Sequence, residues 1–393
     1  MDSKKPKALI VGAGIAGLAA AWWLRKAGWD AAVVERSPAV RDGGYMMSLS
    51  GPGLETIKRM GLFDKVSEVA HRLRENIMHD QRGHEMLRLQ YEDFHGGTEG
   101  TAICRGDLAR VLREALPDDA VRYGETVTEI TADDGEDKVH ATLSSGEKLT
   151  VDLLIGADGI RSSIRDRFWK GEDCLEQLGY SYAAYDIAFA KKLQADCVSF
   201  NCPGYLATVY SLGEDQKAAL HIWRNPQAGP QDRENKMEAV HKIGANGPAL
   251  VTEVVAPFET ASSLVIDDLT MVTLKRWSKG RVLLLGDSAH CLTLISGQGA
   301  CMAVASAEIL ASELMKTNND VAKALANHEK RLRPVIQSLQ AHTRKIAPVY
   351  IPAGALKYHL RNLFLRAMPY SWIVSWYKKS ATGEIDLTQA LKD

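Results

Sequence analysis

Three glycines near the start of the chain have the types and spacing to bind a phosphate. In "LIVGAGIAGLAAAWWL", Gly12, Gly14 and Gly17 form a GxGxxG pattern between the apolar run Ala8–Val11 and a helix expected over Ile15–Lys26. The first glycine permits a tight turn, the second lets a pyrophosphate approach the backbone, and the third lets helix and strand pack closely. Ala16 lies in the first turn of this helix and is a further candidate for cofactor binding. The pattern predicts a βαβ dinucleotide-binding unit.

An acidic residue follows at the distance that such a unit requires. Glu35 ends the second predicted strand, "DAAVVER", where a carboxylate can accept hydrogen bonds from a ribose diol. The neighbouring Arg36 can hold a 2′-phosphate or part of an FAD adenosine. This first turn alone leaves FAD and NAD both open.

A second glycine turn lies far away in the sequence and resolves this ambiguity. "RVLLLGD" ends in Gly286–Asp287, and Gly297, Gln298, Gly299 and Ala300 follow at the start of another predicted helix. Asp287 can accept a hydrogen bond from a ribityl hydroxyl, and the amides of residues 297–299 can stabilise negative charge on a reduced flavin ring. Two glycine-rich turns, each opening a helix, imply one long ligand that is bound at both ends, and we therefore expect FAD.

The order of three motifs resembles that of the group A FAD-dependent aromatic hydroxylases, which have the p-hydroxybenzoate hydroxylase-like fold. These motifs are GxGxxG with Glu35, the segment "DLLIGADGIRSSIR", and "GDSAH…SGQG". The resemblance implies that Asp158 serves FAD and NAD(P)H binding, that Arg105 in "CRGDLARVL" reaches FAD, and that the loop "RDGGYMMSL" with Arg41 borders the flavin. The segment "SGQGACMAVASAEILASEL", with the second glycine turn and the helix that follows it, looks most like that of tetracycline-inactivating monooxygenases and antibiotic-biosynthesis relatives.

This sequence departs from the family pattern at three positions. Leu294 stands where the family often has a proline, and Cys301 stands where an asparagine commonly follows the GQG turn. Ser48 takes the approximate place of an acid in the tetracycline enzymes. The departures at Leu294 and Cys301 affect how the flavin is expected to sit, and the one at Ser48 argues against tetracycline as the substrate.

The resemblance implies an NAD(P)H-consuming monooxygenase that hydroxylates an aromatic, phenolic or polyketide-like molecule through a flavin C4a-hydroperoxide. The cofactor supplies this chemistry, and we therefore assign no catalytic side chain and no metal ligand. An FAD-dependent reductase or dehydrogenase of the same fold, without oxygen insertion, is the alternative. A non-enzymatic flavin sensor is a third possibility.

The pattern of elements predicts an α/β fold with a discontinuous FAD-binding domain over 1–170 and 276–330. Longer alternating strands over 171–275 predict an inserted, mostly antiparallel substrate domain, and the substrate pocket is expected between this sheet and the flavin. Strand alternation does not say which side chains point into this pocket, and seven are candidates: Tyr180, Tyr182, Tyr185, Tyr205, His221, Trp223 and Arg224. The remainder, 331–393, is expected to be helical and broken at its prolines: Pro334, Pro348, Pro352 and Pro369.

Composition excludes several classes of protein. The 393 residues are 46% hydrophobic and 25% charged with a formal net charge of −1, which gives no reason to expect nucleic acid as a partner. Six scattered cysteines without a C-x-x-C pair favour reduced thiols in a cytoplasmic protein. We expect a monomer or homodimer with molecular oxygen as co-substrate. The aromatic, basic tail is expected to pack on the protein rather than on a membrane.

Overall fold

The computed structural model describes residues 5–40, 45–94, 101–132, 137–225, 233–245, 247–261 and 263–380. Arg41, expected beside the flavin, lies outside these residues.

A six-stranded sheet in the order β17-β18-β11-β1-β2-β7 carries the first predicted unit. All neighbours run parallel except the β17–β18 hairpin. β1 and β11 are almost wholly buried apolar runs, as strands covered on both faces must be. The strands are β1 (Lys7–Val11), β2 (Asp30–Glu35), β7 (Val121–Tyr123), β11 (Leu153–Gly156), β17 (Ser278–Lys279) and β18 (Val282–Leu284).

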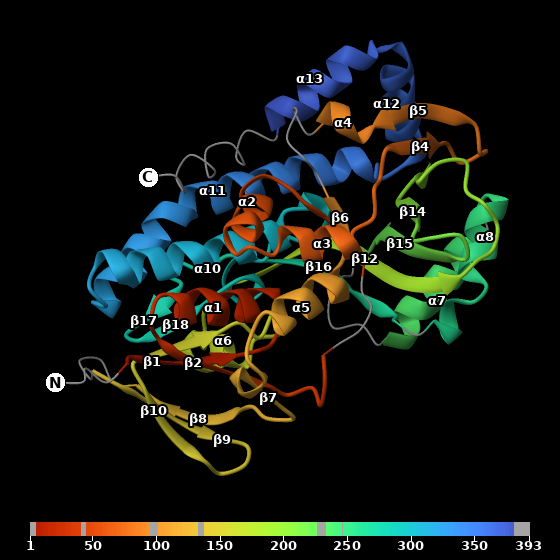
Figure 1. The fold of residues 1–393 in the computed structure, drawn as a ribbon. Coiled ribbons are helices and arrows are strands. Elements are labelled where there is room, and N and C mark those ends of the chain that lie inside the picture. The colour runs from red at the N-terminus through yellow and green to blue at the C-terminus, as the bar shows by residue number, and fades with distance from the viewer. Residues whose placement is uncertain are drawn as a thin grey trace.

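Helices cover one face of this sheet and a small antiparallel sheet lies on the other (Figure 1). The small sheet consists of β8 (Val127–Thr131), β9 (Val139–Leu143) and β10 (Lys148–Val151). Together the layers form the largest hydrophobic core. The helices of this half are α1 (Ile15–Lys26), α2 (Gly51–Arg59), α3 (Phe63–Val69), α5 (Arg105–Glu114), α6 (Ser163–Phe168), α9 (Asp287–His290), α10 (Gly299–Lys316) and α11 (Val321–Tyr350), with short 3₁₀ turns η1 (Asp118–Ala120) and η3 (Leu294–Ser296).

A seven-stranded sheet in the order β16-β12-β15-β14-β13-β4-β5 forms the second half. Its pairs are antiparallel except β13–β4, and its strands come from two separate stretches of chain. They are β4 (Glu75–His79), β5 (Glu85–Gln90), β12 (Leu175–Ala188), β13 (Cys197–Cys202), β14 (Tyr205–Ser211), β15 (Gln216–Arg224) and β16 (Val265–Val272). The domain boundaries at 171 and 275 stay a prediction.

The two faces of this sheet have different neighbours, which separates the seven pocket candidates. Tyr185, Tyr205 and Trp223 belong to the core under α7 (Arg233–Ala245), α8 (Ala249–Val255) and η2 (Phe258–Thr260), and His221 lies between two of them. Tyr180 and Tyr182 belong to the opposite face with Leu294 of the second glycine turn, and Arg224 donates to the Tyr180 hydroxyl. Sequence alternation shows that the faces differ, but it cannot say which one meets the flavin turn.

The C-terminal helices differ from expectation at two prolines. Pro352 and Pro369 separate α11, α12 (Ala355–Ala367) and α13 (Tyr370–Ser380), whereas Pro334 and Pro348 lie inside α11. An interior proline costs about 3 kcal/mol. The helix nevertheless continues because its buried side chains Leu332, Val335 and Ile336 pack into the large core.

Two remaining short elements complete the fold. β3 (Met46–Leu49) pairs antiparallel with β6 (Thr101–Cys104), and α4 (Tyr91–Phe94) follows β5. Among the described residues, no helix is long and apolar enough to cross a bilayer.

Three deeply buried histidines make stability sensitive to acid. Burial lowers the pKa of His221 to about 3, that of His290 to about 4 and that of His328 to about 3. Hydrogen bonds join the His221 ring to the hydroxyls of Tyr185 (2.8 Å) and Tyr205 (2.5 Å). Because the folded ring stays neutral where the unfolded ring is protonated, stability must fall as the pH drops from about 6.5 toward 3.

We therefore expect the free energy of unfolding to depend less steeply on pH in His221→Gln. Each such histidine contributes a slope of about 1.4 kcal/mol per pH unit below pH 6.5, and the variant removes one. Urea unfolding at several pH values between 4 and 7 measures this slope. His140→Gln, on the exposed side of β9, is the control and should keep the wild-type slope. Equal slopes in both variants would contradict the assignment.

Candidate active site

The first glycine turn is built from backbone contacts that leave no room for side chains. Gly12 has φ +108°, and a Cβ there would lie 2.5 Å from the carbonyl oxygen of Ala157 on the neighbouring strand end. A Cβ on Gly17 would lie 1.9 Å from the Gly12 oxygen. The turn is therefore held tightly at the carboxyl end of β1, and α1 begins at Ile15 with Ala16 and Gly17 buried in its first turn.

Glu35 lies beside this turn, at the end of β2. Its Oε2 accepts the N–H of Ala13 (2.8 Å) and its Oε1 accepts the N–H of Ser37 (2.9 Å). The carboxylate is thus oriented by backbone amides at the place expected for the ribose. Arg36, the next residue, is exposed.

The second glycine turn lies against the first. Gly286 has φ +67°, and a Cβ there would lie 2.7 Å from the Cβ of Ala16 on α1. Gly297 is left-handed at φ +66°, and α10 begins at Gly299. A Cβ on Gly299 would lie 3.9 Å from Oδ1 of Asp287, so the carboxylate is close to the amino end of α10. Gln298 and Ala300 flank this point.

Arg105 lies close to both turns. One of its guanidinium nitrogens is 4.0 Å from where a Cβ on Gly14 would be. Burial raises the pKa of the Asp287 carboxyl, and the charge of Arg105 opposes this shift. Asp287 keeps solvent-accessible surface although many protein atoms surround its carboxyl group. A positive charge next to both turns suits a ligand that carries a pyrophosphate.

Two tyrosines extend the site toward the large sheet. Tyr45 and Tyr182 meet edge to face with ring centroids 6.5 Å apart. Burial raises the pKa of Tyr45 to about 12, with Arg105 opposing the shift and Asp287 adding to it. Tyr45 directly precedes β3 in the loop that the sequence placed beside the flavin, and Tyr182 belongs to β12.

The backbone of Asp158 adjoins the first turn, and its side chain accepts hydrogen bonds at the start of α6. Its Cα would lie 3.0 Å from a Cβ on Gly12. Its Oδ2 accepts from the N–H (2.7 Å) and hydroxyl (3.0 Å) of Ser163 at the start of α6. The same segment reaches the second turn, because the buried Arg165 donates to the carbonyls of Ile160 (2.6 Å) and Ser288 (3.3 Å).

The three residues that depart from the family pattern are Ser48, Leu294 and Cys301, and the structure shows what surrounds them. A Cβ on Gly53 of α2 would lie 2.5 Å from the Cα of Cys301, and the Cys301 thiol lies 3.5 Å from the Ser48 carbonyl oxygen. The close approach of α2 leaves little space for a larger side chain at position 301. Thr293, just before Leu294, has φ +65°, which is strained for a β-branched residue and marks the turn as constrained by its surroundings.

A cluster of polar side chains beyond the two tyrosines was not predicted from the sequence. Ligand-type atoms of His71, Cys104 and Asp107 all lie within 4.8 Å of one another. Burial raises the pKa of nearby Asp186, and the Ser263 hydroxyl donates to its Oδ2 (2.9 Å). These residues come from separate elements, and no spacing in the sequence indicates that they meet.

The residues of the two turns fit an FAD molecule. The turns touch at Gly286 and Ala16, so one extended molecule can bridge them. Two buried acceptors at the turns, Asp158 Oδ1 and Gln298 Oε1, have no hydrogen-bond partner within the described part of the chain. Donors on a ribityl chain or a flavin ring would satisfy such atoms. The individual contacts with FAD stay predictions.

Comparisons with known proteins agree with this fit. A model of the family described as FAD binding domain matches residues 5–342. A flavin-dependent monooxygenase from an unidentified prokaryote is 30% identical over 345 residues, which are 86% of this chain and 88% of that protein.

Solved structures agree as well. The tetracycline destructase Tet(55) is similar with a TM-score of 0.81 and 26% identity, covering 96% of this chain and 97% of its own. HpxO of Klebsiella pneumoniae, complexed with FAD and uric acid, shares the fold with a TM-score of 0.83 and 22% identity, over 96% of this chain and 97% of its own. This chain therefore belongs to the FAD binding domain family and is an FAD-dependent monooxygenase.

Proposed function

We propose that the enzyme uses NAD(P)H to hydroxylate an aromatic, phenolic or polyketide-like molecule held between the second glycine turn and the seven-stranded sheet. The observation that carries this proposal is a set of half-buried apolar side chains from the sheet, the second glycine turn and α11 that pack against one hydrophobic cluster. They are Leu178, Tyr182, Leu206, Leu220, Leu294, Ile295 and Tyr350. Half-buried apolar side chains that meet from several elements are typical of a site for an aromatic ligand.

The residues of the turns would hold FAD along its length. Gly12, Gly14, Ala16 and Gly17 would cradle the pyrophosphate with Arg105, and Glu35 with Arg36 would hold the adenosine. Asp287 and the backbone from Gly297 to Ala300 would hold the ribityl chain and ring, with Arg41 and Asp158 nearby. When bound, FAD would accept a hydride from NAD(P)H and would then activate dioxygen.

The protein contributes electrostatics and exclusion of water. α10 begins within the second turn, and the amino end of a helix stabilises negative charge by about 0.3–1 kcal/mol, or more when partly buried. The edge-to-face pair Tyr45–Tyr182 and the side chain of Leu294 cover the site from the sheet side. A dry site strengthens these interactions.

Asp186 gives the pocket a polar end. It lies four residues along β12 from Tyr182 on the same face, about 13 Å away at roughly 3.3 Å per residue. Its Oδ1 is buried without a partner among the described residues. A substrate that reaches from Leu294 to Asp186 has more than one ring and carries a hydrogen-bonding group at its far end.

A coupled assay tests this function. The FAD-loaded enzyme is incubated with NADPH or NADH and a panel of phenolic and polycyclic ligands, under isotopically labelled dioxygen. We expect a ligand that speeds NAD(P)H oxidation and gains one labelled oxygen. A ligand that is reduced without oxygen uptake would instead show the reductase alternative, and slow NAD(P)H oxidation with every ligand would favour a flavin sensor.

A lining variant checks the location of the pocket. Leu220→Phe adds volume to the face that meets Leu294, so the KM of a polycyclic substrate should rise at least tenfold. NAD(P)H oxidation without substrate should change little. An unchanged KM would place the substrate elsewhere.

The enzyme is further proposed to work in the cytoplasm as a monomer or homodimer. The six cysteines all lie within the described residues and none of them forms a disulfide, which suits a reducing compartment. Size measurement in solution tests the oligomeric state.

A further inference from the structure

The C-terminal helix pair α12–α13 presents an apolar face to solvent. Leu356, Leu360, Leu363 and Phe364 on α12 are 73%, 58%, 66% and 62% exposed, and Trp372 on α13 is 67% exposed. The spacing of the four α12 residues places them along one side of the helix. Elsewhere in the described structure, only three large apolar side chains are comparably exposed: Leu175, Met315 and Val349. Grouped exposure of this kind marks an interaction surface.

The opposite side of the pair is polar and firmly attached, which reverses the usual arrangement of a surface helix. Tyr358 is 1% exposed, and its hydroxyl accepts the N–H of Gln81 (3.0 Å) and donates to the Asn201 carbonyl (2.8 Å). Arg361 donates to the Asn201 side chain (2.6 Å), and Arg366 pairs with Asp80 (3.2 Å). The apolar face is therefore held outward by specific contacts with β13 and the loop after β4.

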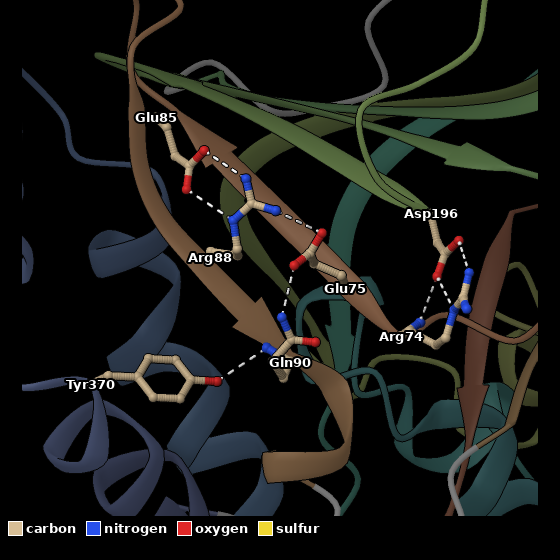
Figure 2. Close-up of polar contacts among 7 residues, drawn as sticks. All are labelled: Arg74, Glu75, Glu85, Arg88, Gln90, Asp196 and Tyr370. Carbon is tan, nitrogen blue, oxygen red and sulfur yellow. Dashed lines mark hydrogen bonds and ion pairs between the residues drawn. The ribbon is translucent and has the colours of Figure 1, made fainter.

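α13 is attached in the same way. Figure 2 shows Tyr370 reaching the edge of the β4–β5 hairpin, where its hydroxyl accepts the N–H of Gln90 (3.0 Å). The same hydroxyl donates to Asp93 (2.8 Å). The neighbouring ion pairs of Arg88 with Glu75 and Glu85 belong to the hairpin itself, which they stabilise beneath the helices.

The C-terminal segment that contains α12 and α13 carries basic residues and no acidic ones. Residues 345–383 contain six Lys and Arg and neither Asp nor Glu, whereas the rest of the chain has 42 Lys and Arg against 49 Asp and Glu. Lys345 and Lys357 are exposed, and Lys357 directly follows Leu356. Arg361 and Arg366 belong to the attached side of α12, so Lys357 is the basic residue of this helix that lies next to its outward apolar side chains. A helix with Leu and Phe outward in a basic, acid-free segment is typical of one that lies in the interface of an anionic membrane.

A second copy of the chain fits this face less well. An isologous dimer through α12–α13 would bring the same basic, acid-free segment of both chains together, and like charges would repel. An anionic lipid surface instead complements both the apolar side chains and the charge. We propose that α12–α13 docks the enzyme onto anionic lipid headgroups, with Leu356, Leu360, Leu363, Phe364 and Trp372 inserted among the lipids. This proposal reverses the expectation from the sequence that the tail packs on the protein rather than on a membrane.

Vesicle co-sedimentation of the full-length, FAD-loaded enzyme tests the proposal. The protein should sediment with phosphatidylglycerol-containing vesicles at low salt, and at least tenfold less with phosphatidylcholine alone or at high salt. Leu360→Ser combined with Phe364→Ser should lower the partition coefficient at least tenfold. Leu175→Ser combined with Met315→Ser, which removes two exposed apolar side chains elsewhere, should leave it unchanged.

Three outcomes would overturn the proposal. The wild-type enzyme stays in the supernatant with all vesicles; both double variants bind as the wild type does; or the lipid-free enzyme forms a dimer that the α12 variant dissociates. Retained bound flavin and NAD(P)H oxidation in both variants show that they are folded. Lipid binding and the identity of the substrate are read out separately, so each can fail alone.

Discussion

The Gly12→Ala variant is expected to purify without bound flavin and without monooxygenase activity. A Cβ at Gly12 would lie 2.5 Å from the Ala157 oxygen and 2.8 Å from its carbonyl carbon, and both atoms are backbone. No rotamer can relieve this overlap, so β1 and β11 must separate where the pyrophosphate is expected. The residue also has φ +108°, where a side chain costs further energy. We expect the Kd for FAD to rise at least ~100-fold, equivalent to about 2.8 kcal/mol.

Gly28→Ala is the matched control for this prediction. Gly28 has a similar φ of +88°, but a Cβ there meets nothing within 4 Å. The control thus carries the conformational cost alone, about 1–2 kcal/mol of stability, and should stay yellow. Fluorescence titration of both apoproteins with FAD gives the two Kd values, and urea unfolding gives the two stabilities. If the Gly12 variant bound FAD as tightly as the Gly28 variant, the first turn would not hold the pyrophosphate.

The first βαβ unit could be predicted closely because its signals are local. The helix expected over Ile15–Lys26 is α1 with the same bounds, and the strand expected over Ala8–Val11 differs from β1 by one residue. Apolar periodicity, the glycine turn and the stop near Gly28 lie within about thirty residues. Each of them depends on backbone geometry rather than on distant partners.

Features that depend on distant partners could not be predicted in this way. β4 joins the seven-stranded sheet by pairing with β13, more than a hundred residues away, and β5 joins it by pairing with β4. The helix through Pro334 depends on core contacts that no local pattern reports. Tyr182 and Tyr185 lie on opposite faces of β12, and their roles differ because of what packs on each face.

The residues of the candidate site also fall into those that local spacing predicts and those that depend on distant contacts. The glycines and Glu35 follow from spacing, because turn geometry limits which residue types fit. The position of Arg105 beside both turns came from the family resemblance, since nothing within residues 101–115 points to Gly14 or Asp287. The group around Asp186 had no sequence signal at all, because it forms where β12 meets α5 and β6.

Arg105→Met is expected to raise the Kd for FAD by about 10- to 100-fold. The substitution keeps much of the side-chain length but removes the charge beside Gly14 and Asp287. Hydrogen bonds to charged groups are worth about 1.5–3 kcal/mol, which sets this range. Arg105→Lys should recover part of the loss, because lysine restores the charge without the planar fork of donors.

Arg110→Met separates cofactor binding from a general effect on α5. Arg110 lies on the same helix, five residues further on, with its side chain 47% exposed and ion-paired to Asp107. It should bind FAD as the wild type does. The Arg105 variant should also lose part of the salt dependence of FAD binding, since it lacks one cation near the pyrophosphate. Equal Kd values and equal salt dependence in the two methionine variants would mean that Arg105 does not bind the cofactor, and the two turns would then need another source of positive charge.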